Sequence, residues 1–103
     1  MKQLIEETLK IAKERFISFG FSPSQIEGLL TSAERDLTKV IIELETLITS
    51  ETASTNEIDR SLHALKGLLY NMGNMEAGDL MIELKNNPDK ESVKSRIKEI
   101  IKS

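Results

Sequence analysis

Cysteine and tryptophan are absent from this sequence, and histidine, proline and aromatic residues are few. Without cysteine the chain forms neither disulfides nor thiolate metal sites, which fits the reducing cytoplasm. A single histidine without cysteine also argues against a zinc site. The aromatic residues are three phenylalanines and one tyrosine, so the core has to consist of Leu, Ile, Val, Ala and Met.

Long apolar runs and strongly basic segments are missing as well. The longest apolar runs, such as 40–42, have three residues, whereas a membrane-spanning helix needs about 20. The net charge of −3 is spread over surfaces of mixed sign, and no basic block is present that would neutralise nucleic-acid phosphates. We therefore expect a cytoplasmic protein that binds neither membranes nor nucleic acids.

Apolar residues recur at helical spacing in the first half of the chain. A first helix is predicted to end at Gly20. Ser22 is placed to cap a second helix that has Pro23 in its first turn. Along this second helix the apolar residues alternate steps of three and four, which is typical of helices packed in a bundle.

The second half of the chain repeats the pattern after a break at 50–53. Ser54 and Glu57 have the spacing of a capping box at the start of a third helix, which ends at Gly73. A fourth helix follows Asn74, and a fifth is expected to open at 87–88. The predicted core positions are Ile5, Leu9, Ala12, Phe16, Phe19, Ile26, Leu30, Ala33, Leu37, Val40, Leu44, Leu47, Ile58, Leu62, Leu65, Leu69, Met72, Ala77, Leu80, Met81, Leu84, Val93, Ile97, Ile100 and Ile101.

These elements predict an all-α fold, an antiparallel four-helix bundle with an additional N-terminal helix. With 103 residues and no composition break, the chain is expected to be one domain, 1–103, and a monomer. No Gly-rich phosphate loop is present, so an ATP-dependent enzyme is not expected. Met72, Met75 and Met81 are interpreted as core filler in preference to a soft-metal site.

His63 is the residue with the clearest chemical potential. If the apolar stripe of its helix faces the core, the imidazole points about 140° away from it, towards solvent. A buried structural histidine is therefore the weaker interpretation. Position alone favours an inert surface histidine, because exposed polar residues are common and mostly silent.

Two neighbours favour a functional role for His63. Lys66 lies one turn on, where its ammonium group can reach a group attached to the imidazole. Gly67 lies inside the helix, where glycine costs about 1 kcal/mol relative to alanine. Close approach of another molecule would explain that glycine, and so would packing of a neighbouring helix.

The segment His63-Ala64-Leu65-Lys66-Gly67, followed by Gly73, resembles the signature of histidine phosphotransfer (HPt) domains. The closest likeness covers 58–85, where Arg60, Leu80 and Leu84 also fit the pattern.

The resemblance implies a phosphoryl carrier in a two-component phosphorelay. His63 would receive the group from a receiver-domain aspartate or a sensor histidine kinase and pass it to another receiver. Lys66 would offset its charge, and Gly67 would leave room for the receiver. Any magnesium would be held by the receiver, so this chain would need no cofactor and would not itself be an enzyme.

Several positions depart from that family. Leu68 and Leu69 stand where small residues are frequent, and Ala77 stands where leucine is common. Lys85 occupies a position where many members carry Glu or Gln as a hydrogen-bond acceptor for the imidazole. Counting residues about the hairpin at Gly73 places 84–85 level with His63. A lysine cannot accept the imidazole N–H, although it can add a cation beside a phosphate.

A docking surface for a partner is predicted around His63. Ile42 should be level with the histidine and exposed, since it lies about 160° from its own helix's apolar stripe. With Asp59, Leu68 and Tyr70 it forms the candidate docking set. An isolated exposed isoleucine is also ordinary on protein surfaces. The main alternative function is a helical adaptor that binds a signalling partner without carrying phosphate; a further one is the excised end of a larger helical protein.

Overall fold

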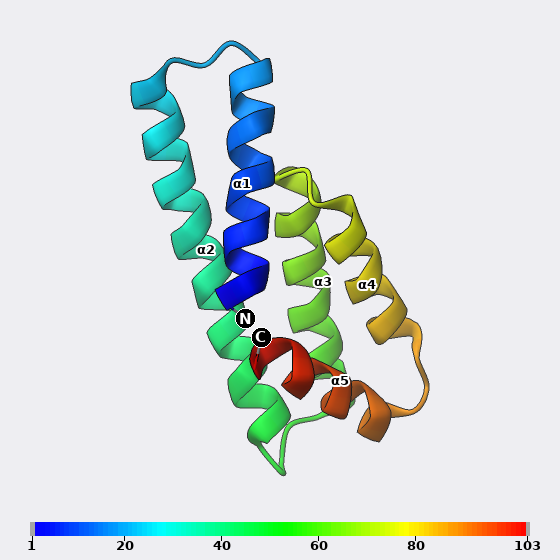
Figure 1. Ribbon diagram of the computed structural model, residues 1–103. Helices are drawn as coiled ribbons and strands as arrows, with labels where there is room; N and C mark the ends of the chain where they lie inside the picture. Colours follow the sequence, from blue (N-terminus) through cyan, green and yellow to red (C-terminus); the bar gives the residue numbers. More distant parts are fainter. Residues whose placement is uncertain (1, 103) are drawn as a thin grey trace.

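The computed structural model describes residues 2–102, and within them it contains five α-helices and no strand (Figure 1). The predicted all-α class is thereby confirmed. The helices are α1 (Lys2–Ser18), α2 (Pro23–Thr49), α3 (Thr55–Asn71), α4 (Met75–Asn86) and α5 (Lys90–Lys102).

The long helix α2 is the element on which the others assemble. Its 27 residues span about 40 Å. Figure 1 shows α1 beside the first half of α2, α3 beside the second half, and α4 on the far side of α3. α5 runs obliquely across the lower end of the assembly and contacts α2. The α1–α2 hairpin projects beyond the α3–α4 turn, whereas the shorter α4 lies beside α3 (Figure 1).

The helix ends follow the predicted local chemistry. Gly20 and Gly73 have φ angles of +84° and +91°, which L side chains rarely adopt, so each glycine ends a helix as expected. Ser54 and Glu57 form the predicted capping box. Ser22 caps α2 as predicted, and Gln25 completes a second capping box there.

The start of α5 differs from the prediction by two residues. The Asn87 side chain accepts a hydrogen bond from the backbone N–H of Asp89 at 2.9 Å. The Asp89 carboxylate in turn accepts one from the Ser92 N–H at 3.2 Å. Asp89 therefore occupies the capping position, and Pro88 lies in the preceding turn rather than in the helix.

The core contains no aromatic side chain among its buried residues, as the composition predicted. It consists of Ala12, Ile26, Ala33, Leu37, Ile41, Leu44, Ile48, Ile58, Leu62, Leu65, Leu69, Met72, Met81, Leu84, Val93 and Ile97.

One core prediction was wrong, and on α2 the predicted Val40 and Leu47 pack only at the edge of the core. Phe19 is exposed because α1 ends at Ser18 and no helix covers the following loop. On α2, Ile41 and Ile48 are buried while Val40 and Leu47 are half-buried. The core face of α2 is turned towards Ile41 because the start of α1 lies beside it.

Met75 departs from its expected role as core filler. Met72 and Met81 are buried in the core, as filler should be, whereas Met75 is exposed. Within the described range 2–102, no cluster of three His, Cys, Asp or Glu side chains is placed to hold a metal ion. No helix in the same range has the length and apolar character needed to cross a membrane.

α1 is attached to the α3–α4 turn by polar contacts. The Asn74 amide donates a hydrogen bond to Thr8 Oγ1 at 2.8 Å, and both residues are buried. Arg15 Nη1 donates to the backbone carbonyls of Tyr70 and Asn71, each at 3.3 Å. The two Arg15 bonds reach carbonyl groups in the last turn of α3, where Tyr70 O also accepts from the Gly73 N–H at 3.0 Å.

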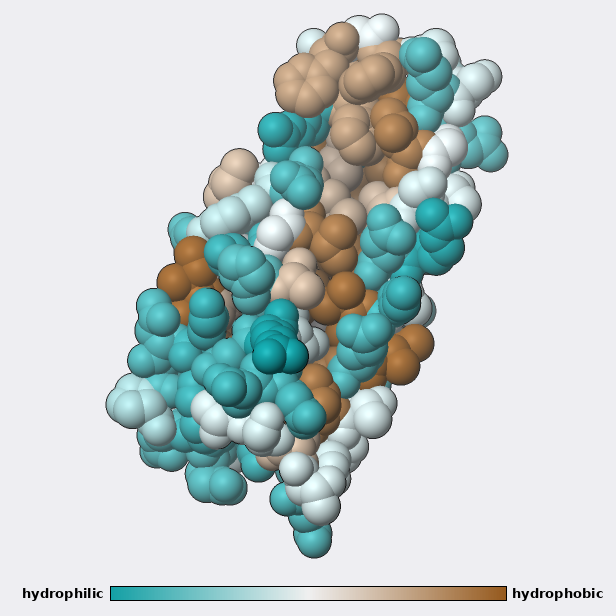
Figure 2. Space-filling model, turned by 180° about the vertical axis from the view of Figure 1, so that it is seen from behind, coloured by the Kyte–Doolittle hydropathy of each residue, from teal (hydrophilic) through white to brown (hydrophobic). Residues whose placement is uncertain are grey.

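The free end of the α1–α2 hairpin carries an apolar cluster. Phe16 and Phe21 meet edge to face with their ring centroids 5.9 Å apart, and Arg15 lies over the Phe19 ring. Figure 2 shows this cluster as a brown and tan area at the top of the molecule. Phe19 and Phe21 are exposed, and so are Ile17 and Leu29 on the flanking helices α1 and α2.

Candidate functional site

His63 lies on the exposed side of α3, as predicted. The rotation of the helix is set by its other side, where Leu62 and Leu65 are fully buried. Because both neighbours are locked in the core, the helix holds the imidazole at a defined place on the surface. An imidazole nitrogen is a possible nucleophile, and at this place a partner can reach it.

The imidazole borders a hollow between α3 and α4. The hollow is lined from α3 by Asn56, Asp59, Arg60 and His63, and from α4 by Lys85. Lys85 and His63 both line this hollow, as their equal level in the α3–α4 hairpin predicts. A hydrogen-bond acceptor from α4 is not among the lining residues, because lysine only donates.

One charge in the hollow is already neutralised. Lys90, at the start of α5, forms an ion pair with Asp59, with 3.2 Å between Nζ and Oδ1. The same ammonium group donates to the Lys85 carbonyl at 2.9 Å. Lys90 therefore joins α3, α4 and α5 at one point, directly beside the hollow.

Lys66 and Gly67 follow His63 along α3, and both are half-buried. A Cβ atom built at Gly67 would have no described atom within 4 Å apart from the adjoining backbone of its own helix. Packing of a neighbouring helix therefore does not explain this glycine, and close approach of another molecule is the alternative that stays open. Lys66 is not among the residues that line the hollow. The cationic side chains that do line it are Arg60 and Lys85.

A groove between α2 and α3 adjoins the hollow. It has a volume of about 540 Å³ and contains Ile42, which is 56% exposed as predicted. Arg60 borders both the groove and the hollow. The Ser61 hydroxyl at the groove wall is buried and has no hydrogen-bond partner within residues 2–102. The full lining is Ile42, Glu43, Thr46, Leu47, Glu57, Arg60, Ser61 and Ala64.

The four candidate docking residues lie on two sides of His63. Ile42 and Leu68 face the junction of α2 and α3, where Leu68 is half-buried beside Val40. Asp59 and Tyr70 face α4 and α5 instead. The docking surface suggested by the sequence is thus divided by the outward face of α3.

Tyr70 is held against α4 by two contacts. Its hydroxyl donates a 2.5 Å hydrogen bond to the Asp79 carboxylate. Its ring lies over Gly78 so closely that a Cβ atom there would overlap with it. The hydrogen bond from the neutral phenol to Asp79 raises the pKa of Tyr70 above its ordinary value, because ionisation would break the bond and place two negative charges together.

Sequence reasoning missed Lys90 and Gly78. Gly78, like Gly67, is a glycine inside a predicted helix, and this unusual position could have identified it from the sequence. Lys90 is 31 residues from Asp59, and no local pattern indicates which surface charges will meet.

Comparison of the chain with protein-family models, curated proteins and solved structures finds no match.

Proposed function

We propose that this protein is a histidine phosphotransfer domain, a carrier that relays a phosphoryl group through His63 in a two-component phosphorelay. The proposal includes the finer fold expected from the sequence, an antiparallel four-helix bundle with an additional N-terminal helix. In this arrangement the helix that bears His63 belongs to the bundle and presents the imidazole on its outer surface.

The observation that carries the proposal is the setting of His63. Its imidazole is exposed, it borders a hollow with the cations Arg60 and Lys85, and the surface over Gly67 one turn away is open. Phosphoryl transfer mainly requires in-line access to the nucleophile and compensation of phosphate charge. The exposed imidazole on α3 and the cations Arg60 and Lys85 on α3 and α4 support the proposal on both points.

The transfer step needs little from this chain. The unprotonated imidazole nitrogen of His63 attacks the phosphorus of an aspartyl phosphate on the receiver. The P–O bond to the aspartate breaks, and its electron pair leaves with the carboxylate. The new N–P bond makes the ring cationic until the proton on its other nitrogen passes to solvent. Reversal of the step delivers the group to a second receiver.

The partners are receiver domains and, upstream, a sensor histidine kinase. The α2–α3 groove adjoins the hollow through Arg60 and exposes the apolar side chain of Ile42. We propose this groove as the place where a receiver docks, because an apolar surface next to the nucleophile would align the two proteins for in-line attack.

The test is to mix the purified chain with a phosphorylated receiver and to follow the label. We expect an acid-labile phosphoryl group on the wild type and none on His63→Gln. Because His63 is exposed, the variant should have the wild-type unfolding curve, so a missing label would not reflect misfolding. Absence of label on the wild type with receivers from several relays would overturn the carrier function.

A helical adaptor without phosphate is the second candidate. The observation in its favour is Lys85, which stands beside His63 and cannot orient the imidazole as an acceptor. If the protein is an adaptor, the wild type and His63→Gln should bind the receiver or kinase with equal affinity. Neither form should become labelled. The labelling experiment therefore separates the two functions.

A further inference from the structure

The hollow beside His63 has more positive than negative charge. Its only acid is Asp59, and the pair with Lys90 neutralises that carboxylate. The side chains of Arg60 and Lys85 form no ion pair with an acid within residues 2–102. The hollow is therefore cationic, although the whole chain has a net charge of −3.

The Asp59–Lys90 pair is held in place, so Asp59 stays occupied. Lys90 donates at the same time to the Lys85 carbonyl at the end of α4. The side chains of Lys90 and Asp59 are only 22% and 25% exposed. A partly buried pair is screened by salt much less than a surface pair, and in this structure Asp59 forms its ion pair with Lys90 rather than with Arg60 or Lys85.

The remaining groups in the hollow are suited to an anion. Arg60 and Lys85 are donors and carry no acceptor, and the Asn56 amide adds two further N–H donors. Cationic donors around an exposed space recognise tetrahedral oxyanions, for which Arg and Lys are the usual protein ligands.

We propose that the hollow is an oxyanion site in which Lys85 and Arg60 bind a phosphate group, either free inorganic phosphate or the phosphoryl group carried by His63. Binding of the phosphoryl group on His63 rests on the proposed function, whereas binding of free inorganic phosphate does not. Lys85 thus acts by binding the phosphate rather than by orienting the imidazole. The consequence is a carrier whose phosphorylated form is favoured, because the two cations stabilise the added negative charge.

The first experiment titrates the unphosphorylated protein with inorganic phosphate at constant ionic strength and follows the imidazole signals by NMR. His63 is the only histidine, so its signals need no assignment. We expect a saturable shift in the wild type and binding weaker by about two- to fivefold in Lys85→Gln, the usual size for one exposed cation. The double variant with Arg60→Gln should lose saturable binding.

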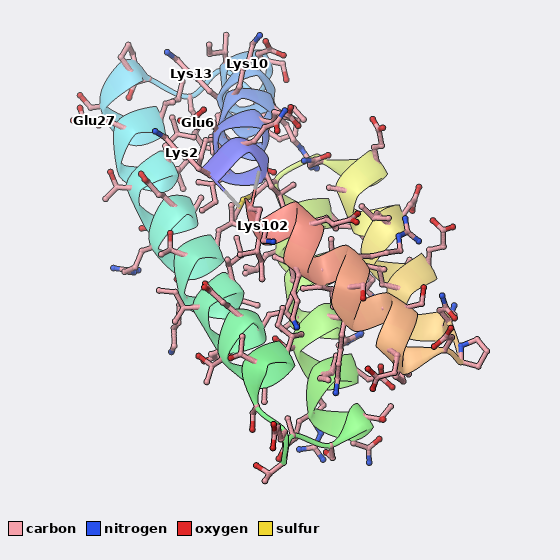
Figure 3. The ribbon with its side chains drawn as sticks, turned by 60° about the horizontal axis from the view of Figure 1, so that its bottom comes forward. Lys2, Glu6, Lys10, Lys13, Glu27 and Lys102 are labelled. Atoms are coloured by element: carbon pink, nitrogen blue, oxygen red, sulfur yellow. The ribbon has the colours of Figure 1, made fainter. Side chains whose placement is uncertain are left out.

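A matched control removes one positive charge elsewhere. Lys13 is exposed and lies on α1 near Lys10, far from the start of α5 (Figure 3). Lys13→Gln should bind phosphate as the wild type does. Equal affinities in wild type and Lys85→Gln, or equal weakening in Lys85→Gln and Lys13→Gln, would overturn the oxyanion site.

The second experiment uses phosphoramidate as a small-molecule donor. The imidazole nitrogen attacks phosphorus, the P–N bond of the donor breaks, and the departing nitrogen takes up a proton to leave as ammonia. At fixed phosphoramidate and ammonia, we expect the ratio of phosphorylated to free His63 to fall about two- to fivefold in Lys85→Gln.

The two experiments separate the two proposals. Intact phosphate binding without any label on the wild type, from phosphoramidate or from a receiver, would overturn the proposed function and leave the oxyanion site standing. Label at the wild-type level in Lys85→Gln, together with unchanged phosphate affinity, would overturn the oxyanion site and leave the carrier function standing.

Discussion

The ring of Tyr70 lies directly on the backbone of Gly78, so that α3 and α4 approach closely at a point where only glycine fits. The hydroxyl of the same tyrosine is bonded to Asp79, the next residue of α4. Gly78 is thus explained by packing inside the chain, whereas Gly67, also within a helix, has open space over its Cα. Substitution of Gly78 and of Gly67 is therefore expected to have opposite effects on stability.

Gly78→Ala should destabilise the protein. The new methyl group overlaps the Tyr70 ring, and overpacking of this kind costs about 1–3 kcal/mol, against a gain of about 1 kcal/mol from better helix propensity. We expect the free energy of unfolding in urea to fall by about 1 kcal/mol. Gly28→Ala is the control, because a Cβ there meets no atom within 4 Å, and it should raise the free energy of unfolding.

Gly67→Gln should separate stability from function. The substitution relieves the helix of a glycine, so the free energy of unfolding should rise by about 0.5–1 kcal/mol. The transfer rate from a phosphorylated receiver should fall at least tenfold, because the side chain occupies the space that the partner approaches. Gly28→Gln should give the same rise in stability with an unchanged rate. An unchanged rate in Gly67→Gln would show that this surface is not used.

Asp79→Asn should lower the pKa of Tyr70 towards its ordinary value. The hydrogen bond to the Asp79 carboxylate favours the neutral phenol and raises the pKa in the folded state. This bond therefore stabilises the fold below the pKa of an unfolded tyrosine, about 10, and the contribution is lost as the pH rises through the higher folded value. Absorbance titration of tyrosinate measures the pKa of Tyr70 directly, since Tyr70 is the only tyrosine. Identical titration curves for both proteins would contradict the bond.

Ile42→Asp should slow phosphotransfer from a receiver without unfolding the protein. Ile42 lies in the α2–α3 groove and is 56% exposed, so a charge there costs little stability but disfavours an apolar contact with a partner. We expect a loss of at least tenfold in the second-order rate constant. Ile17→Asp is a matched control with the same exposed fraction of 56%, at the other end of the molecule. Equal rates for the two variants would exclude the groove.

Thr8→Val should weaken the attachment of α1. Valine has the shape of threonine but leaves the buried Asn74 amide without its acceptor, which costs about 1–3 kcal/mol. Thermal unfolding should therefore shift to lower temperature. Thr31→Val is the control, because Thr31 is exposed and its hydroxyl only donates to the carbonyl one turn back. A similar small shift in both variants would contradict a stabilising role for the Thr8–Asn74 bond.

Much of the site was accessible to sequence reasoning because it depends on one helix. The outward direction of His63 follows from the apolar residues of α3, and its level relative to Lys85 follows from the length of the hairpin. The exposure of Ile42 could be predicted in the same way. Phe19 was misplaced in the core, because periodicity cannot show where neighbouring helices stop covering one another.

By itself the sequence determined the elements whose causes act within one or two turns. The capping boxes at Ser22 and Ser54 and the stops at Gly20 and Gly73 are of this kind, since backbone donors and φ angles are satisfied locally. Only the tertiary structure decided that Lys90 neutralises Asp59 and leaves the hollow beside His63 cationic. That pairing depends on where α5 crosses the other helices, and this crossing is a property of the packed core rather than of any local segment.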